Sequence, residues 1–260
     1  LRFAYSRTVN RPEFREIAPF LFYDYENEAA RVGNADLKTA EIDNLDFRYE
    51  FYPNKGETMS LGAFYKRFDN PIENVTQITT EQPQFNYANA DSAFNYGVEL
   101  EIRKSFKEWT NNLFLGRLSL NLNASYIFSE VDLGANVTSQ QQVRALQGQS
   151  PYIVNAALGY NDETGFSANV IYNRFGDRIY SVGDVNFPTI YELSRNSLDL
   201  TVSKTFKETT VKFGIQNLLD AEYQFFEDSN RDEEIDKSID NPTSIFKKGA
   251  LFSVGVTHNF

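Results

Sequence analysis

The sequence lacks cysteine altogether and has a single histidine among its 260 residues. Without cysteine there is no disulfide framework and no thiolate metal site. With His258 as the one histidine, a multi-histidine metal site is excluded and a Ser/His/Asp triad has no plausible base. Glu99 and Glu101 could form an acid/base pair, but ion pairing with nearby arginines explains them better. No catalytic residue is therefore predicted, and the protein is not expected to be an enzyme.

Long apolar runs are also missing. No stretch approaches the roughly 20 apolar residues that a transmembrane helix needs, which excludes a helical membrane protein. The net charge of −11 argues against nucleic acid as a partner, because phosphates require basic patches. Aromatic residues nevertheless make up 15% of the chain, although its mean hydropathy is −0.47. Apolar residues must therefore be dispersed among polar ones, as the strands of a membrane barrel require.

The last ten residues show this dispersion most clearly, because they alternate without interruption. Successive side chains of a strand point to opposite faces. One face therefore carries Phe252, Val254, Val256, His258 and Phe260, and the other carries small neutral side chains. Such a strand is typical of a wall between lipid and a polar lumen.

About ten segments of this kind follow one another, which predicts an all-β, transmembrane antiparallel β-barrel fold. The connections between them are alternately short and long. Because the periplasmic turns of outer-membrane barrels are short, the short connections predict the periplasmic end and the long ones the outer end. The predicted strands cover roughly 1–9, 40–52, 58–69, 94–107, 118–128, 151–161, 165–180, 192–206, 209–215 and 251–260.

Five stretches in this order resemble the C-terminal half of the β-barrel of TonB-dependent outer-membrane receptors, in the SusC-like form common in Bacteroidota. They are 6–16 (SRTVNRPEFRE), 64–73 (FYKRFDNPIE), 95–104 (NYGVELEIRK), 216–223 (QNLLDAEY) and the terminal Phe260. The resemblance implies that 1–260 is the C-terminal part of one barrel domain of about 22 strands. It further implies that the plug and the N-terminal strands lie outside this chain.

The same resemblance implies a function and partners. A receptor of this family sits in the bacterial outer membrane, in contact with its lipid, and imports a scarce nutrient such as a glycan, a peptide or a siderophore with energy delivered through TonB. Expected partners are the plug, TonB, the barrel-assembly machinery and a SusD-like lipoprotein. The terminal strand, with Phe252, Val254, Val256 and Phe260, is expected to carry the assembly signal, although a terminal aromatic that only anchors at the membrane interface would look the same.

Other interpretations of the sequence remain open. The chain could be a mature protein whose first strand starts at its cleavage site. It could be a self-contained barrel of about ten strands, such as an outer-membrane protease or an adhesin-like barrel. It could also be a receptor homologue that serves as a scaffold in a larger complex. An upstream plug and TonB box would distinguish the import receptor from these alternatives.

Two candidate ligand sites lie in the long connections. Asp228, Asn230 and Asp232 have the 1, 3, 5 spacing of a calcium loop, so calcium is a candidate cofactor. However, Glu233 occupies the position of the usual glycine, and a solvated acidic loop is the alternative. A second group, Phe22, Tyr23 and Tyr25 together with Phe20, could stack on a ligand or simply pack within its loop.

Overall fold

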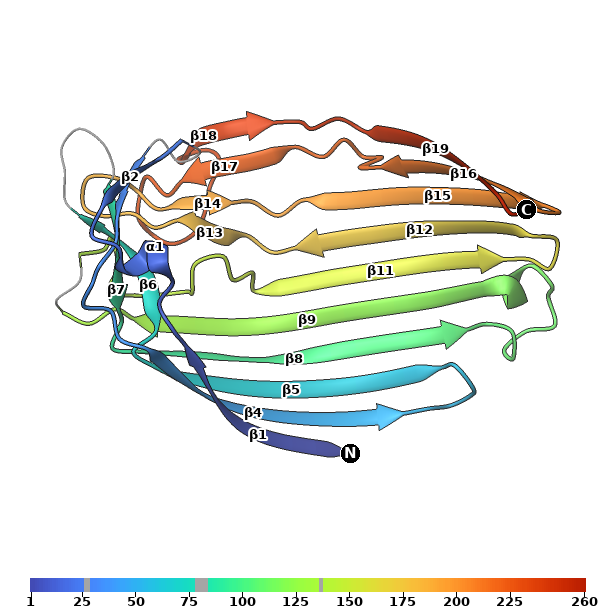
Figure 1. The fold of residues 1–260 in the computed structure, drawn as a ribbon, viewed down its shortest axis with the longest axis horizontal. Helices are drawn as coiled ribbons and strands as arrows, with labels where there is room; N and C mark the ends of the chain where they lie inside the picture. The colour runs from blue at the N-terminus through green and yellow to red at the C-terminus, as the bar shows by residue number, and fades with distance from the viewer. Residues whose placement is uncertain (26–28, 78–83, 136–137) are drawn as a thin grey trace.

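The protein is seen here as a computed structural model, which describes residues 1–25, 29–77, 84–135 and 138–260. Ten long strands form one antiparallel wall in which strand order follows the chain (Figure 1). Short turns join the strands at one end of the wall, and long connections gather at the other, which we call the loop end. The strands of the wall are β1 (Arg2–Asn10), β4 (Ala40–Phe51), β5 (Thr58–Asp69), β8 (Ser92–Ser105), β9 (Leu118–Asp132), β11 (Tyr152–Asn161), β12 (Phe166–Phe175), β15 (Asn196–Phe206), β16 (Thr209–Gln216) and β19 (Leu251–His258), with the short β10 (Val143–Arg144) paired to β9.

Strand register keeps like side chains together across the wall. Leu158 lies opposite Leu120 on one side and Val170 on the other, and this apolar row continues into the following strands. On the opposite face, Asn155 lies between Asn123 and Asn173, and the Asn173 amide donates a hydrogen bond of 2.7 Å to the Asn155 carbonyl oxygen. The predicted alternation is therefore confirmed: the apolar face points to lipid and the polar face to the lumen.

The wall is open. Its edges are β1 and β19, and neither of these strands, both fully described, pairs with the other. An unpaired strand edge inside a bilayer leaves backbone N–H and C=O groups without partners. These ten strands are therefore part of a barrel and not a closed barrel, as the sequence predicts.

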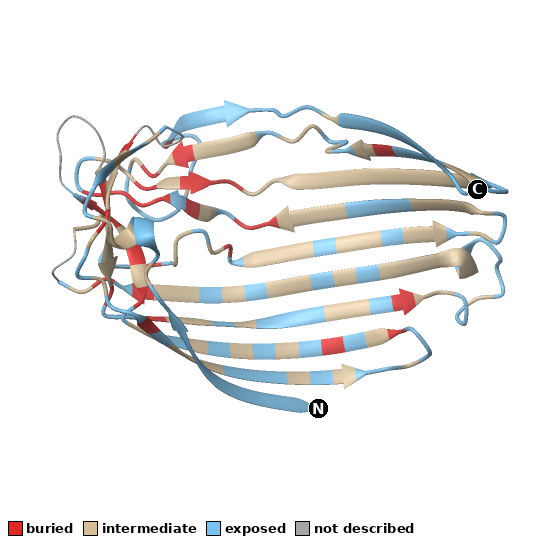
Figure 2. Cartoon of the chain, in the orientation of Figure 1, coloured by how far each residue is buried: buried red, intermediate tan, exposed pale blue. Residues whose placement is uncertain are grey.

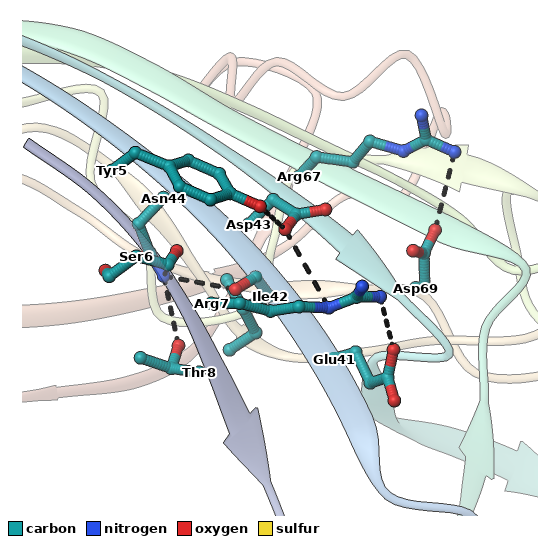
Figure 3. A network of polar contacts seen from close by, with 10 residues as sticks. All are labelled: Tyr5, Ser6, Arg7, Thr8, Glu41, Ile42, Asp43, Asn44, Arg67 and Asp69. Carbon is teal, nitrogen blue, oxygen red and sulfur yellow. Dashed lines mark hydrogen bonds and ion pairs between the residues drawn. The ribbon is translucent and has the colours of Figure 1, made fainter.

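Charged side chains end the apolar face of β1, β4 and β5 toward the loop end (Figure 3). Arg7 pairs with Glu41 and lies 3.8 Å from Asp43, and the Tyr5 hydroxyl donates a 2.8 Å hydrogen bond to Asp43. Below this cluster, β4 continues with apolar and aromatic residues at every second position. Since ionised side chains avoid the hydrocarbon region, the cluster marks the outer limit of the lipid-facing band.

An ion pair also lies on the outward face at the opposite end. The Lys104 ammonium group is 2.8 Å from the carboxylate of Glu57, in the β4–β5 turn, and both residues are buried. The Asn54 amide and the Ser105 backbone N–H also donate hydrogen bonds to Glu57. The hydrogen bond from Lys104 above all holds the pKa of Glu57 below its ordinary value, so Glu57 is ionised at neutral pH.

Two smaller sheets stand at the loop end. One extends the wall beyond β12, β15, β16 and β19, from which it is separated by irregular segments at 176–177, 193–195, 217–222 and 247–250. Its strands are β13 (Arg178–Ser181), β14 (Ile190–Glu192), β17 (Tyr223–Glu227) and β18 (Asn241–Phe246). The other comprises β2 (Leu21–Asp24), β3 (Ala29–Val32), β7 (Gln84–Asn89) and β6 (Ile72–Gln77), with β3 and β7 parallel.

These sheets correct the sequence interpretation at three connections. The regions after 10, after 69 and after 217 were expected to be long loops, yet each contains paired strands. The predicted strands 165–180 and 192–206 are each interrupted, at 176–177 and at 193–195. A four-residue α1 (Phe14–Ile17) and a 3-10 turn η1 (Leu115–Arg117) complete the described elements. Neither of these helices is long and apolar enough to cross a membrane.

The hydrophobic core lies at the loop end and not in the wall. Figure 2 shows that buried residues gather there, whereas most of the wall is intermediate or exposed. One core cluster joins the two small sheets, with Ala29 and Phe85 from one and Ile179, Tyr191 and Phe226 from the other. A second cluster, built around Val131 and Leu133, anchors the loops to the outer ends of β8 and β9. The loop end is thus a packed structure with its own core.

The assignment of faces gives a direct prediction for β9. Leu122 lies near the middle of the apolar face, opposite Ala156 and Ile102. Leu122→Arg should lower the free energy of unfolding by about 2–4 kcal/mol, because it places a charge at mid-membrane depth. The measurement is reversible unfolding of the full-length receptor in lipid vesicles. Asn123→Arg, on the lumen face, is the matched control and should be much milder. The opposite order of the two effects would contradict the register.

Candidate ligand-binding site at the loop end

A cavity of about 830 Å³ opens beside the sheet that extends the wall. Aromatic side chains dominate the residues around it, and two carboxylates and one lysine add charge. This composition is typical of ligand pockets, which combine apolar surface with a few polar groups. The lining residues are Phe85, Tyr180, Ser181, Val182, Phe187, Pro188, Ile190, Glu192, Tyr223, Phe225, Glu227, Thr243, Ser244, Phe246 and Lys248.

The aromatic rings of the cavity form a continuous group across β13, β17 and β18. Tyr223 and Phe246 lie opposite each other in the β17–β18 pair, and their rings stack with centroids 5.0 Å apart. Phe225 stacks on Phe246 at 6.2 Å and meets the Tyr180 ring edge-on at 4.7 Å. Strand pairing therefore holds these rings in place, so the aromatic surface is preorganised for a ligand.

Cations gather beside the same rings. The Arg195 guanidinium lies 4.0 Å from the ring centroid of Tyr223 and 5.2 Å from that of Phe175, and the Lys248 ammonium group lies 4.3 Å from the Tyr223 centroid. Both contacts are within cation–π range. Among the described residues, no carboxylate oxygen lies within 4.0 Å of either cation, and the buried Nε of Arg195 has no hydrogen-bond partner. We call Arg195, Tyr223, Phe246 and Lys248 the basic–aromatic cluster. Tyr223, Phe246 and Lys248 line the cavity, and Arg195 contacts the Tyr223 ring, so the cluster offers positive charge to an anion.

A second cavity, of about 450 Å³, lies between the two small sheets and is lined by Glu73, Arg178 and Glu192, among others. Glu73, one of its lining residues, also forms a buried ion pair: the Arg144 guanidinium is 2.9 Å from the Glu73 carboxylate and also donates to the backbone oxygens of Ala145 and Asn74. Burial raises the pKa of Glu73 and Arg144 opposes that rise. The pair joins β6 to β10 and so fixes one small sheet to the wall.

Asp228, the first predicted calcium ligand, organises the last long connection. It is completely buried and accepts hydrogen bonds from the backbone N–H groups of Asp232 and Glu233 and from the Gln140 amide. Burial and the Asp228 charge raise the pKa of Glu233, and Asp228 also contributes to the raised pKa of the buried Tyr191. The Asp228 carboxylate thus fixes the loop by accepting hydrogen bonds from the backbone of the residues that follow it, a role that sequence spacing does not reveal.

The structure brings the other predicted calcium ligands close to Asp228. The Asn230 amide donates to the Asp232 carboxylate at 2.9 Å. Glu233, at the position where a calcium loop has glycine, adopts φ = 71°, so the loop takes the left-handed turn despite the missing glycine. In the described ranges, however, no group of three or more His, Asp or Glu side chains is arranged to hold a metal ion. Calcium binding stays a prediction.

The predicted aromatic group Phe22, Tyr23 and Tyr25 is divided by its own strand. Phe22 contacts Phe20 edge-on and lies under Arg15, whereas Tyr23 contacts Tyr25 at 5.0 Å. Adjacent residues of β2 point to opposite faces, so the three residues do not form one surface. None of them lines the 830 Å³ cavity. Sequence analysis could have found Tyr223 and Phe225, which do line this cavity, from the period-2 alternation in 223–227.

The lumen face of the wall carries its own polar network. Arg48 lies 2.7 Å from Glu101 and 2.9 Å from Glu50, and Arg2 lies 3.1 Å from the second oxygen of Glu50. Arg48 and Glu101 line a cavity of about 260 Å³ together with Glu99, Ser60 of β5, and Asn123 and Ser125 of β9. The pairing of Glu101 with Arg48 confirms the expected ion pair for Glu101, whereas that of Glu99 stays a prediction. Such a surface suits contact with water or with another polar protein segment.

The terminal strand places its predicted residues as the sequence suggests. Phe252, Val254 and Val256 lie on the apolar face opposite Ile215, Phe213 and Val211, and all three are exposed in this chain. The Phe260 ring meets the His258 ring edge-on at 4.8 Å. Geometry alone leaves the assembly role of these residues a prediction.

Comparisons with known proteins identify relatives of this wall. A family model described as "TonB dependent receptor-like, beta-barrel" matches residues 1–218. Among curated proteins, no sequence matches the chain. Similar solved structures include the siderophore receptor PirA from Pseudomonas aeruginosa (15% identity, TM-score 0.59, 99% of this chain and 39% of that one) and the copper transporter OprC (16%, 0.65, 99% and 36%). Another is the ferric yersiniabactin uptake receptor FyuA from Yersinia pestis (14%, 0.56, 89% and 31%). At these identities the likeness shows the fold, and the chain spans less than two fifths of each relative.

The Arg144–Glu73 pair gives a testable consequence for the loop end. Arg144→Met or Glu73→Gln alone should destabilise the loop end by about 3–5 kcal/mol, because either leaves a buried group unpaired. The double variant should recover much of that loss. Hydrogen exchange of the amides in 72–77 and 143–148 measures the effect locally, with the amides of β15 as the internal control. Additive losses in the double variant would show that the pair is not coupled.

Proposed function

The chain belongs to the TonB-dependent receptor-like β-barrel family, and on this basis we propose that it forms the C-terminal part of the barrel of an outer-membrane receptor that imports a scarce nutrient into the periplasm. Its family and structural neighbours are receptors and transporters and not enzymes. In this proposal, residues 1–260 belong to one barrel domain, and the remaining strands and the plug lie elsewhere in the full protein.

The observation that carries the proposal is a polar path bounded by the wall. The basic–aromatic cluster and its cavity stand at the loop end, and the lumen face continues from there as rows of Asn, Ser and paired charges. A nutrient captured at the loop end would enter a lumen lined by polar groups. The network around Arg48 adds paired charges to this face, which suits contact with a polar plug.

The open edges of the wall favour this proposal over a self-contained barrel of about ten strands. Both β1 and β19 are fully formed strands with apolar outward faces, yet each pairs on one side only. Closure therefore requires further strands, which a receptor barrel of about 22 strands supplies. The turns at the end opposite the loops face the periplasm, and energy reaches the receptor through TonB by way of the N-terminal part of the protein.

The charge of the basic–aromatic cluster suggests the chemistry of the cargo. Two cations without carboxylate partners, set against stacked rings, favour a cargo that combines negative charge with flat or apolar surface. An anionic metal chelate or an acidic peptide fits this description better than a neutral glycan does. The named relatives include receptors for siderophores and a copper transporter, which is compatible with a chelate.

The stretches 6–16, 64–73 and 95–104 further suggest the SusC-like subtype found in Bacteroidota, and with it a SusD-like lipoprotein seated over the loop end. The barrel-assembly machinery is a further proposed partner, engaged through β19. Copurification of a lipoprotein with the full receptor from its native outer membrane would test the subtype independently of the cargo.

Uptake assays test the proposed import. A strain without the gene should lose growth on the limiting nutrient, and the wild-type gene should restore it only when TonB is present. Growth that is equal with and without TonB would overturn import by this route. Purified ferric chelates, acidic peptides, vitamins and neutral oligosaccharides supplied as sole sources identify the cargo class.

Arg195→Gln combined with Lys248→Gln should weaken binding of an anionic cargo by about tenfold or more, since each charge-assisted contact contributes about 1.5–3 kcal/mol. Titration of the purified receptor measures this change. Lys247→Gln is the matched control, because Lys247 lies 3.9 Å from Asp220 and from Glu222 and is paired within the protein. Equal effects of the two changes would contradict the role of the basic–aromatic cluster.

The proposed assembly signal has a separate test. Deletion of Phe260 should reduce the amount of folded, heat-modifiable receptor in the outer membrane, because the assembly machinery recognises the last strand as an added strand at an exposed edge. Val170→Asn, on the apolar face of β12, is the matched control, since it reduces the apolar surface toward lipid but lies outside the terminal strand. Unchanged levels of folded receptor after the deletion would remove the assembly role and would not affect the import proposal.

A further inference from the structure

The turn between β8 and β9, residues 106–117, differs from the other turns at the end opposite the loops. Those at 53–57, 162–165 and 207–208 are short and polar. The 106–117 turn is longer and exposes four large apolar side chains: Trp109 is 71% exposed, Leu113 79%, Phe114 60% and Leu115 45%. Concentrated apolar exposure of this kind on a water-facing turn requires a covering partner.

The turn leans over the outward face of the wall. The Phe114 ring lies 5.1 Å from the ring of Tyr160, and the Arg117 guanidinium donates to the Tyr160 hydroxyl at 3.4 Å. Tyr160 lies opposite Leu118 and Ala168, which belong to the lipid-facing rows. The apolar side chains of the turn therefore continue the lipid-facing band without a break.

Several backbone N–H groups of the turn donate hydrogen bonds within the turn. The Asn112 side-chain oxygen accepts hydrogen bonds from the N–H groups of Phe114 and Leu115, and the Asn112 backbone oxygen accepts one from Gly116. The Trp109 N–H donates to the Phe106 backbone oxygen. Backbone groups that already have partners lower the cost of entering the edge of a bilayer.

The charge beneath the turn is neutralised. Lys104, on the outward face of β8, lies 4.5 Å from the centroid of the Trp109 indole and pairs with Glu57. An unpaired ammonium group at this depth would oppose contact with lipid. The Lys104–Glu57 pair, beside the Trp109 indole, has no net charge and does not. Trp and Phe rings of this kind favour the level of the lipid headgroups.

From this geometry we infer that the 106–117 turn is a membrane-interface anchor, which inserts Trp109, Leu113 and Phe114 into the phospholipid leaflet on the periplasmic side of the barrel. The occupant of this apolar surface is phospholipid, because the surface is continuous with the lipid-facing rows of β9 and β11. Leu113 and Phe114 are largely exposed although Phe114 contacts Tyr160, so the leaflet supplies the cover for their remaining apolar surface. The inference is independent of the cargo and of TonB.

Trp109 is the single tryptophan of this chain and provides the probe. The full-length receptor is reconstituted in vesicles of phosphatidylethanolamine with a minor fraction of phosphatidylglycerol, with and without bromine on the acyl chains near the glycerol. The emission of the wild type minus that of Trp109→Phe isolates Trp109. We expect brominated lipid to reduce this emission about twofold or more and aqueous iodide to reduce it little.

Lys55→Trp in the Trp109→Phe background is the matched control, since Lys55 occupies an exposed polar turn at the same end. Its added emission should respond to iodide and not to brominated lipid. Trp109 emission that behaves like this control would overturn the anchor, and would indicate a turn facing water or a protein partner. Leu113→Asp with Phe114→Asp, checked for folding by heat modifiability, should restore iodide quenching of Trp109. Unchanged lipid quenching in that variant would also overturn insertion by the turn.

Discussion

The structure depends on one constraint: inside a bilayer every backbone N–H and C=O group needs a partner within the protein. The antiparallel wall meets it with ladders that run from β1 to β19, and the fixed period of two then divides every strand into a lipid side and a lumen side. Composition follows from this division. A negative mean hydropathy and abundant aromatic residues coexist because only half of each strand needs to be apolar. The same ladders leave one edge of β1 and one edge of β19 unpaired among the described strands.

Most of the wall could be predicted from the sequence, because its signal is local and repetitive. The segment 58–69 matches β5 (Thr58–Asp69), and the remaining wall strands differ from expectation mainly at their ends. The loop-end strands were missed for a physical reason. Strands such as β14 and β17 are short, and their buried side chains belong to the core cluster between the two small sheets. Their pairing therefore depends on contacts distant in the sequence and not on local alternation.

The candidate site shows the same contrast. Spacing brought Asp228, Asn230 and Asp232 together correctly, yet it did not show that the Asp228 oxygens already accept backbone N–H groups. Proximity in sequence grouped Phe22 with Tyr23, although adjacent residues of a strand face opposite ways. Arg195 and Lys248 carry no local signal, because they meet only when the segments before β15 and before β19 lie on either side of Tyr223. A sequence pattern cannot identify residues that come together only through contacts between distant segments.

The irregular segments between the wall and the sheet that extends it separate two parts of the chain under different structural constraints. The wall fixes barrel diameter through strand number and stagger, so an inserted residue there would shift every following row. At 217–222 and 247–250 the ladder is replaced by a side-chain clasp, in which the Asn217 amide donates to the Gly249 oxygen and Asp220 accepts from the Gly249 N–H. Beyond that clasp, strands can lengthen, shorten or be exchanged while the stagger of the wall is preserved. The clasp is thus the boundary between strands whose register is fixed by the wall and strands that are held by a core of their own.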